Sequence, residues 1–224
     1  MPPPGLVDQG VPWHYGDPLG EQRRLSAGEG AVDLGNRAVI EVSGPDRLTW
    51  LHDLTTQHLR DLAPGDSALA LILGPTGHVE YELHLVDDGH SCWISTEGSA
   101  STDLVAYLQR MRFMLRVEVA DRSSDVGIVW TPDRSFDALT WQVPEPFASR
   151  GMRGFESIVP REHLAERIAS AGSPAGTWAL EALRTAAVMP RIGCETDHKT
   201  IPNEVGWLAD AMGPNAVHLD KGCY

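Results

Sequence analysis

The sequence predicts an α+β fold of mixed, mostly antiparallel sheets with flanking helices. Two observations carry this prediction. Apolar and polar residues alternate with period two over residues 69–85, a pattern typical of a β-hairpin. Segments whose apolar residues recur at helical spacing stand singly between this hairpin and other short strand patterns. Hairpins interleaved with isolated helices favour α+β architecture.

The first elements precede that hairpin. Residues 1–16 are rich in Pro and Gly, and we expect them to be loosely ordered. Asp17 is placed to cap a short helix that has Pro18 in its first position and runs through Leu25. Residues 38–42 predict a strand that ends at Gly44-Pro45-Asp46. A helix then follows, indicated by leucines at helical spacing: Leu48, Leu51 and Leu54.

The hairpin has a predicted turn at residues 74–77, between strands that alternate in polarity. The apolar residues of its second strand are Val79, Tyr81, Leu83 and Leu85. The residues between them are Glu80, Glu82 and His84, and we expect this second face to be exposed to water.

The remaining elements are less regular. A strand at residues 92–94 is followed by a helix that Ser101 or Thr102 caps, and then by a strand at residues 115–119. Further strands are expected at residues 126–130, 138–143 and 155–159, with helices over 160–171 and 176–188. We expect an N-terminal extension and short helix (1–30), a first α+β lobe (31–120) and a second lobe (121–224), with the boundary near residues 120–125.

The charge balance limits the partners. The formal net charge is −13, from 18 Lys and Arg against 31 Asp and Glu. Such a balance opposes binding to phosphate backbones or to an anionic membrane, so we expect neither as a direct partner. The nearest basic group is Arg110, Arg112 and Arg116, which we interpret as a solvated face or a holder of a small anionic ligand.

The cysteines indicate a reducing compartment. The chain has 3 of them, with no C-x-x-C spacing, so it encodes neither a disulfide framework nor a thiolate zinc site, and we expect no metal. The N-terminus lacks the basic and apolar regions of a signal peptide, and no segment approaches the length of a membrane span. We therefore predict a cytoplasmic protein.

The last four residues place a thiol close to an ammonium group in the sequence. If the run from Lys221 to Cys223 is extended, the ammonium and the thiol lie on one face, where the cation favours the reactive thiolate. Gly222 has no Cβ, so a ligand or a strand is able to approach the backbone there. A small buried cysteine beside a solvated lysine is the alternative interpretation.

A longer pattern surrounds these residues. Lys221-Gly222-Cys223-Tyr224 follows the run from Thr200 to Leu208, and the chain also carries Trp13-His14-Tyr15-Gly16-Asp17-Pro18-Leu19 and Gly44-Pro45-Asp46-Arg47-Leu48. Together these segments resemble the YgfZ-type folate-binding proteins, which support iron–sulfur enzymes and are related to the glycine-cleavage aminomethyltransferases. That family's motif reads K-G-C-Y-x-G-Q-E. We therefore expect the chain to be the N-terminal portion of such a protein, cut inside its signature and lacking the family's C-terminal β-barrel.

The resemblance implies a function. It implies an aminomethyltransferase-like folate-binding fold with tetrahydrofolate in a central cavity, Cys223 as the functional thiol and Lys221 as its cationic neighbour. The residues implied to contact the folate are Gly222, Tyr224, Glu204, Trp207 and Arg184. The implied partners are folate and iron–sulfur enzymes or cluster assembly proteins, with an effect on tRNA modification through such enzymes.

Two departures from the family pattern leave the activity open. Aminomethyltransferases carry an Asp–Asp pair after the hairpin glycine, where this chain has Glu80-Tyr81. Relatives read L-R-x-E-A-G in a later helix, with a glutamate that binds the pterin, where this chain has Ala186. Glu204 is the expected substitute. The alternatives to an iron–sulfur accessory protein are therefore an aminomethyltransferase and a folate-sensing pseudoenzyme.

Overall fold

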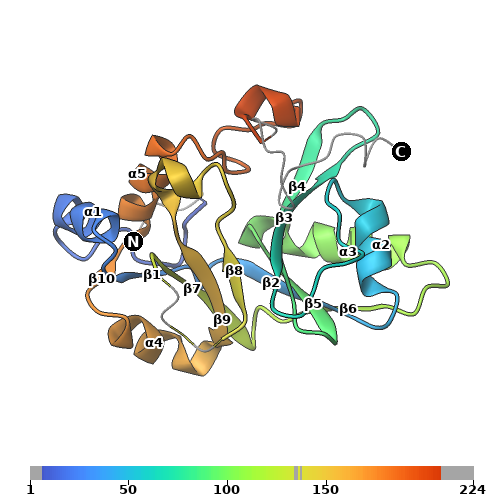
Figure 1. The fold of residues 1–224 in the computed structure, drawn as a ribbon, viewed down its shortest axis with the longest axis horizontal. Coiled ribbons are helices and arrows are strands. Elements are labelled where there is room, and N and C mark those ends of the chain that lie inside the picture. The colour runs from blue at the N-terminus through green and yellow to red at the C-terminus, as the bar shows by residue number, and fades with distance from the viewer. Residues whose placement is uncertain (1–6, 134–135, 137, 208–224) are drawn as a thin grey trace. The chain divides into compact units, whose positions relative to one another are not determined.

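The computed structural model describes residues 7–133, 136 and 138–207 (Figure 1). The chain divides into two compact units that interleave in sequence. Unit 1 comprises Met1–Arg37 and Ser123–Met189, and unit 2 comprises Ala38–Arg122 and Pro190–Tyr224. The chain therefore crosses between the units at 37/38, 122/123 and 189/190. The division into lobes at 31–120 and 121–224 stays a prediction.

Unit 1 is built on a five-stranded sheet in the order β10-β1-β7-β9-β8. Its strands are β1 (Ala31–Asp33), β7 (Val126–Thr131), β8 (Thr140–Gln142), β9 (Phe155–Pro160) and β10 (Pro174–Ala175). Its helices are α1 (Pro18–Ser26), α4 (Leu164–Ser170) and α5 (Thr177–Ala186), with the short helical turns η2 (Ala148–Met152) and η3 (Arg161–His163). β1 pairs with β10 in parallel, and the other pairs of this sheet are antiparallel.

The N-terminal helix of unit 1 begins as its sequence predicts. The Asp17 side chain accepts a hydrogen bond from the Gly20 amide at 3.0 Å, and Pro18 occupies the first turn. Glu21 is 1% exposed and accepts from the amides of Tyr15 and Gly176 at 2.7 and 2.9 Å. This buried carboxylate therefore ties α1 to the start of α5, a role that its place in a short polar helix does not indicate.

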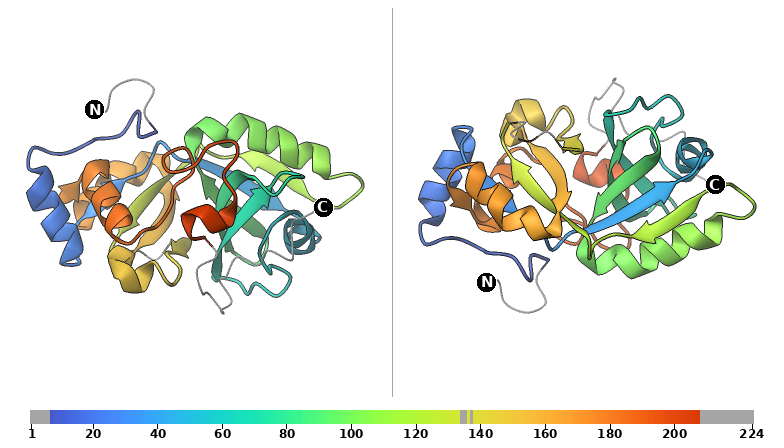
Figure 2. Two further views of the ribbon diagram at one scale, coloured as in Figure 1. Left: turned by 90° about the horizontal axis from the view of Figure 1, so that it is seen from above. Right: turned by 90° about the horizontal axis from the view of Figure 1, so that it is seen from below.

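Unit 2 contains a second five-stranded sheet, in the order β3-β4-β5-β2-β6, in which every pair is antiparallel. Its elements are β2 (Ala38–Ser43), α2 (Arg47–Leu54), β3 (Ser67–Leu73), β4 (Val79–Asp87), β5 (Ser91–Thr96), η1 (Gly98–Ala100), α3 (Ser101–Met111), β6 (Glu118–Asp121) and η4 (Pro202–Val205). Helix α3 lies along β2 and β6 (Figure 2) and contributes Leu104 and Leu108 to the core. Both units mix short helices with mainly antiparallel strands, which confirms the predicted α+β class.

The hairpin face that the sequence predicts to be exposed to water is largely buried. Glu80 is exposed as expected, but Glu82 and His84 are only 3% and 4% exposed. The reason lies far along the chain, because the Ile192 amide donates to a Glu82 carboxylate oxygen at 3.3 Å and the Val79 amide donates to the Thr200 carbonyl. Residues 190–200 thus cover part of a face that local alternation assigns to solvent.

Two smaller expectations are also wrong. Ser101 does not cap α3 with its side chain, because a 3-10 turn precedes the helix and the Ser101 hydroxyl donates to Asp121 at 2.6 Å. The strand expected at residues 115–119 begins at Glu118, and Leu115 lies in an exposed turn before it. The short strands β1 and β10 were not predicted, since neither is long enough to show a period.

Candidate functional site

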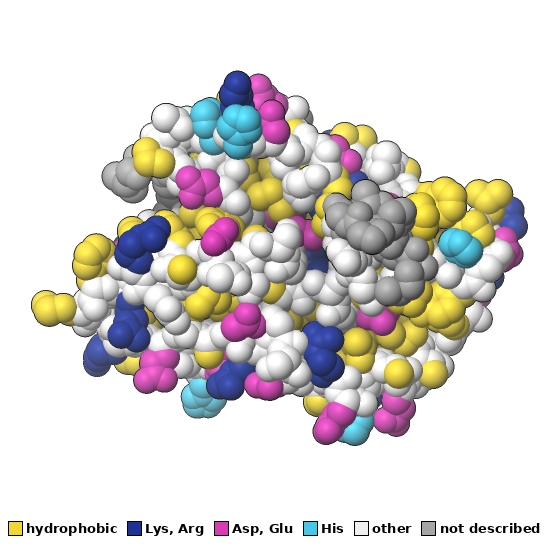
Figure 3. Space-filling model, turned by 180° about the vertical axis from the view of Figure 1, so that it is seen from behind, with side chains coloured by type: hydrophobic (Ala, Val, Ile, Leu, Met, Phe, Trp, Pro, Cys, Tyr) yellow, Lys and Arg dark blue, Asp and Glu magenta, His cyan; other side chains and the backbone are white. Residues whose placement is uncertain are grey.

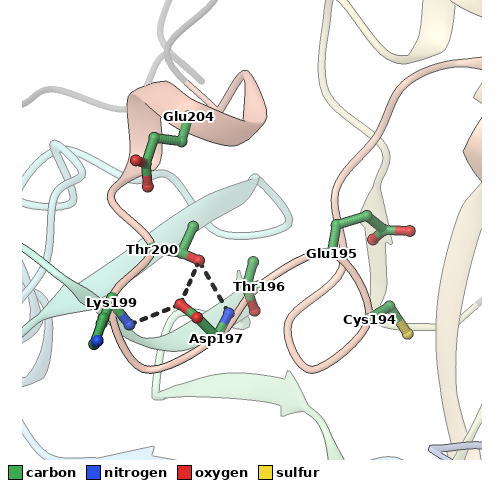
Figure 4. Close-up of a pocket in the computed structure, with 7 residues that line it drawn as sticks. All are labelled: Cys194, Glu195, Thr196, Asp197, Lys199, Thr200 and Glu204. Atoms are coloured by element: carbon green, nitrogen blue, oxygen red, sulfur yellow. Dashed lines mark hydrogen bonds between the residues drawn. The ribbon is translucent and has the colours of Figure 1, made fainter.

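Unit 2 has an open hollow of about 480 Å³ on the segment from Cys194 to Glu204 (Figure 4). This volume lies within the range of small-molecule sites. Its lining is polar and comes entirely from one stretch of chain: Cys194, Glu195, Thr196, Asp197, Lys199, Thr200 and Glu204. Glu204 is thus the one described folate-contact candidate that lines this hollow.

The floor of the hollow is a tight polar turn. The Asp197 carboxylate accepts from the Lys199 amide at 2.8 Å and from the Thr200 hydroxyl at 3.1 Å, and the Asp197 amide donates back to that hydroxyl at 2.9 Å (Figure 4). These bonds, led by the one from the Lys199 amide, hold the pKa of Asp197 below its usual value. Asp197 is therefore a fixed negative charge at neutral pH.

The same segment is anchored to the sheet by a buried ion pair. Arg191 and Glu97 form two hydrogen bonds of 2.8 and 3.0 Å, and their side chains are 8% and 5% exposed. The Arg191 amide also donates to Glu195 at 3.0 Å. A bidentate pair of this kind fixes the orientation of the guanidinium, and hence the path of the chain that leads into the hollow.

Glu204 closes one side of the hollow and shapes its own segment. One of its carboxylate oxygens, Oε2, accepts from the Ile201 amide at 3.0 Å and caps the short helix η4, which ends at Gly206 with φ of 81°. Among the described residues, its other oxygen has no hydrogen-bond partner. That oxygen remains able to accept from a ligand.

The chemistry of the hollow follows from its lining. Three carboxylates, two hydroxyls and one amine suit a cationic group or one rich in N–H donors, and they repel a phosphate. Within the described part of the chain, no group of three or more His, Cys, Asp or Glu is arranged to hold a metal ion.

The other predicted site residues lie elsewhere. Lys221, Gly222, Cys223 and Tyr224 are outside the described residues. Arg184 belongs to unit 1, where it is 6% exposed and binds the Glu181 carboxylate at 2.7 Å and the Met189 carbonyl at 2.6 Å. Its predicted contact with folate stays a prediction.

Trp207 is buried in unit 2, with 3% of its surface exposed. Its indole nitrogen has no hydrogen-bond partner among the described residues. Trp207 lies three residues after Glu204 but does not line the hollow. Stacking of Trp207 on a pterin stays a prediction.

At the hairpin position where the resemblance places paired aspartates, this chain has Glu80 and Tyr81. Glu80 is exposed on β4. Tyr81 is half-buried, and its ring centroid lies 6.1 Å from that of Tyr107 on α3. Burial, followed by the charges of Asp103 and Glu80, raises the pKa of the Tyr81 hydroxyl. This position therefore has a neutral phenol packed against the core and one solvated carboxylate.

Several buried polar residues that contact the segment 190–192 were not predicted from the sequence. They include Glu82 and Glu97, with His84 beside Glu82 at 3.5 Å. Polar residues alternate with apolar ones in the same way whether the polar face of the strand is exposed to water or is covered by another segment. The opposite charges of Glu97 and Arg191 are the only sequence feature that indicates this pairing, and the two residues are 94 positions apart.

The chain is similar in sequence to aminomethyltransferases of several bacteria. The chain is 24% identical over 245 residues to the aminomethyltransferase of Bordetella petrii, covering 93% of this chain and 67% of the relative. It is also 24% identical over 243 residues to that of Nitrosococcus oceani, covering 94% of this chain and 65% of the relative. The chain matches no protein-family model.

A solved structure supports the same relationship at the level of the fold. The glycine-cleavage aminomethyltransferase T of Bartonella henselae superposes with a TM-score of 0.75 over 95% of this chain, at 17% sequence identity. The chain has the aminomethyltransferase fold. It spans about two thirds of the length of these relatives, 66% in the case of the solved structure. No helix among the described residues is long and apolar enough to cross a membrane.

Proposed function

We propose that this protein is a tetrahydrofolate-binding accessory protein of the YgfZ type, which supports the assembly or repair of iron–sulfur clusters and, through iron–sulfur enzymes, tRNA modification. The observation that carries the proposal is the aminomethyltransferase fold combined with the residues at the hairpin. Tyr81 packs against Tyr107 where the resemblance places a carboxylate pair, and Glu80 is solvated. The fold is retained, whereas the acid pair associated with aminomethyl transfer is replaced.

The described residues fit the amino-pyrimidine edge of a pterin at Glu204. Adjacent N–H groups of that edge suit a carboxylate, and one Glu204 oxygen has no partner among the described residues. Ala186, at the position where relatives carry the pterin-binding glutamate, is exposed at the end of α5. Bound tetrahydrofolate would supply ring nitrogens that carry a one-carbon unit. The chain's own residues would hold and orient the pterin.

The functional thiol of the proposal is Cys223, with Lys221 as its neighbour. The other cysteines fit this role less well. Cys92 is fully buried, and burial raises the pKa of its thiol, which makes it unreactive near neutral pH. Cys194 is exposed and lines the hollow, but it lies outside the motif on which the resemblance rests.

Calorimetric titration with tetrahydrofolate tests the folate part of the proposal. Glu204→Gln keeps an oxygen to cap η4 but removes the charge, so we expect affinity to fall about tenfold or more, as for loss of a hydrogen bond to a charged group. Glu162→Gln is the control, because Glu162 is an exposed carboxylate of unit 1. Equal affinities for the two variants would exclude Glu204 as the pterin ligand, and absence of binding by the parent chain would exclude folate.

Aminomethyl transfer is the second candidate, favoured by the names of the relatives. Aminomethyl transfer requires a group that transfers a proton to or from the folate nitrogen. Formaldehyde release from a glycine-derived aminomethyl substrate would favour this activity over the accessory role. Folate binding with no requirement for Cys223 would instead favour a folate-sensing pseudoenzyme.

A further inference from the structure

The turn between α3 and β6 exposes three consecutive large apolar side chains. Phe113, Met114 and Leu115 are 80%, 97% and 44% exposed. Single exposed apolar residues are ordinary on protein surfaces, but a contiguous group indicates an interaction site. We name residues 112–116 the apolar turn. Hydrophobic side chains stand out beside Lys and Arg side chains at the left edge of Figure 3, where this turn lies.

The apolar turn is held in one conformation. Phe113 has φ of 47°, a left-handed conformation that is rare for an aromatic residue. The Leu115 amide donates to the Arg112 carbonyl at 3.0 Å, which closes the turn. A bulky residue in a strained conformation persists only where the surrounding structure holds it there.

Anchors at both ends provide that support. Before the turn, the Trp50 indole donates to the Met111 carbonyl at 3.1 Å. At its last residue, Asp46 accepts from the Arg116 amide at 2.9 Å and from the Arg116 guanidinium at 2.7 and 3.0 Å. Phe113 and Met114 are therefore presented to solvent by a preorganised turn, an arrangement that lowers the entropy lost when a partner binds.

The stretch of sequence that holds the turn is locally basic, although Asp103 and Glu118 flank it and Asp46 pairs with Arg116. Residues 104–117 contain three arginines and no Asp or Glu, in a protein of net charge −13. Arg116 is paired with Asp46, whereas Arg110 lies over the Tyr107 ring at 5.7 Å, and Arg112 makes one long bond of 3.5 Å to the Val117 carbonyl. Arg110 and Arg112 therefore keep donors for an acidic group.

We propose that the apolar turn, with Tyr107 and Arg110, is the docking surface for a partner protein that offers an apolar pocket with an acidic rim. Phe, Met, Tyr and Arg are the residue types enriched at the centres of protein interfaces. Charge complementarity selects the acidic rim, and it steers the encounter despite the acidity of the chain as a whole. An anionic bilayer is a poorer match, because the net charge of −13 is repelled by it.

Site-specific photo-crosslinking tests the proposal. A photoreactive phenylalanine analogue replaces Met114 in one sample and Leu19 in the control, since Leu19 is 66% exposed in unit 1. We expect a protein that cross-links in cells from position 114 and not from position 19. That protein, once purified, should bind the unmodified chain with an affinity that falls as salt rises from about 0.1 M to about 1 M, where the screening length shrinks from about 10 Å to about 3 Å.

The variants separate docking from folding. Met114→Ser and Phe113→Ser together should weaken binding about tenfold or more while leaving the thermal melt of the chain no lower. Neutralising the acidic residues at the cross-linked site of the partner should give a similar loss. Equal cross-linking from positions 114 and 19 would overturn the proposal. So would cross-linking between two copies of this chain, or binding through Phe113 to phosphatidylserine-containing vesicles without a protein partner.

Discussion

The buried ion pair between Arg191 and Glu97 is expected to stabilise the segment that forms the hollow, and substitutions at these two positions test this expectation. Their side chains are 8% and 5% exposed, and two hydrogen bonds of 2.8 and 3.0 Å join them. Glu97→Leu removes the carboxylate with little change in volume and leaves the guanidinium buried without its main charge partner. Glu97 directly follows β5, so the change lies in the framework of unit 2 and not in the lining of the hollow.

The expected size of the effect follows from the burial of the pair. Removing one partner of a buried pair typically costs about 3–5 kcal/mol, because the remaining charge stays desolvated. Replacing both partners by apolar residues is often nearly neutral. We therefore expect Glu97→Leu to lower the free energy of unfolding by about 3 kcal/mol or more, and the double variant with Arg191→Met to recover most of that loss.

Urea unfolding followed by circular dichroism measures these differences. Asp53→Ala is the control, because Asp53 and Arg60 form a pair of similar length, 2.9 Å, whose side chains are 58% and 54% exposed. An exposed pair contributes at most about 1 kcal/mol. The reasoning is wrong if Glu97→Leu costs no more than Asp53→Ala, or if the double variant is as unstable as the single one. Faster proteolysis at residues 190–200 in Glu97→Leu would link the loss to the covering segment.

Two further predictions concern the backbone and the charge of single residues. Val188 follows α5 with φ of 55°, a conformation that glycine adopts without strain, so Val188→Gly should raise the free energy of unfolding by about 1 kcal/mol in thermal or urea melts. Ala186→Gly, at the end of the helix itself, should instead lower it by about 0.5–1 kcal/mol, and a loss from both variants would contradict the account. Hydrogen bonds from Arg116 hold the pKa of Asp46 below its ordinary value of 3.8. The bond from the Arg116 side chain has the larger effect, and the bond from the Arg116 amide has the smaller one. The ionised Asp46 carboxylate therefore contributes to stability fully above pH 3.8, and this contribution is lost as the pH falls below that value. Asp46→Asn should destabilise the chain at pH 7 and not at the lowest pH at which the chain is folded. A loss of stability that persists at that low pH would contradict the assignment.

Local patterns were sufficient for much of the fold. Capping by Asp17, the leucine spacing of α2 and the alternation of β4 each depend on neighbours within a few residues, and the corresponding elements are present. The burial of Glu82 was not predictable in this way, because the chain that contacts it is 110 residues distant. The interleaving of the two units is likewise a long-range property, since short strands such as β1 and β10 pair across the length of unit 1.

The candidate site was predictable only in part. Glu204 was chosen because the chain lacks an acid at position 186, and it does line the hollow. Its use of one oxygen to cap η4 depends on the local backbone at Ile201, which no pattern of residue types indicates. The anchoring by Arg191 and Glu97 joins two segments that are adjacent only in the folded chain.

We propose that this fold serves iron–sulfur enzymes and not aminomethyl transfer. The most direct measurement is the activity of an iron–sulfur enzyme in cells that lack the gene, after its return as the parent or as Cys223→Ser. We predict that the parent restores activity, that Cys223→Ser does not although it is folded and present at the same level, and that the purified parent releases no formaldehyde from an aminomethyl substrate. Full restoration by Cys223→Ser, or formaldehyde release with unchanged iron–sulfur activity in the deletion strain, would contradict the account.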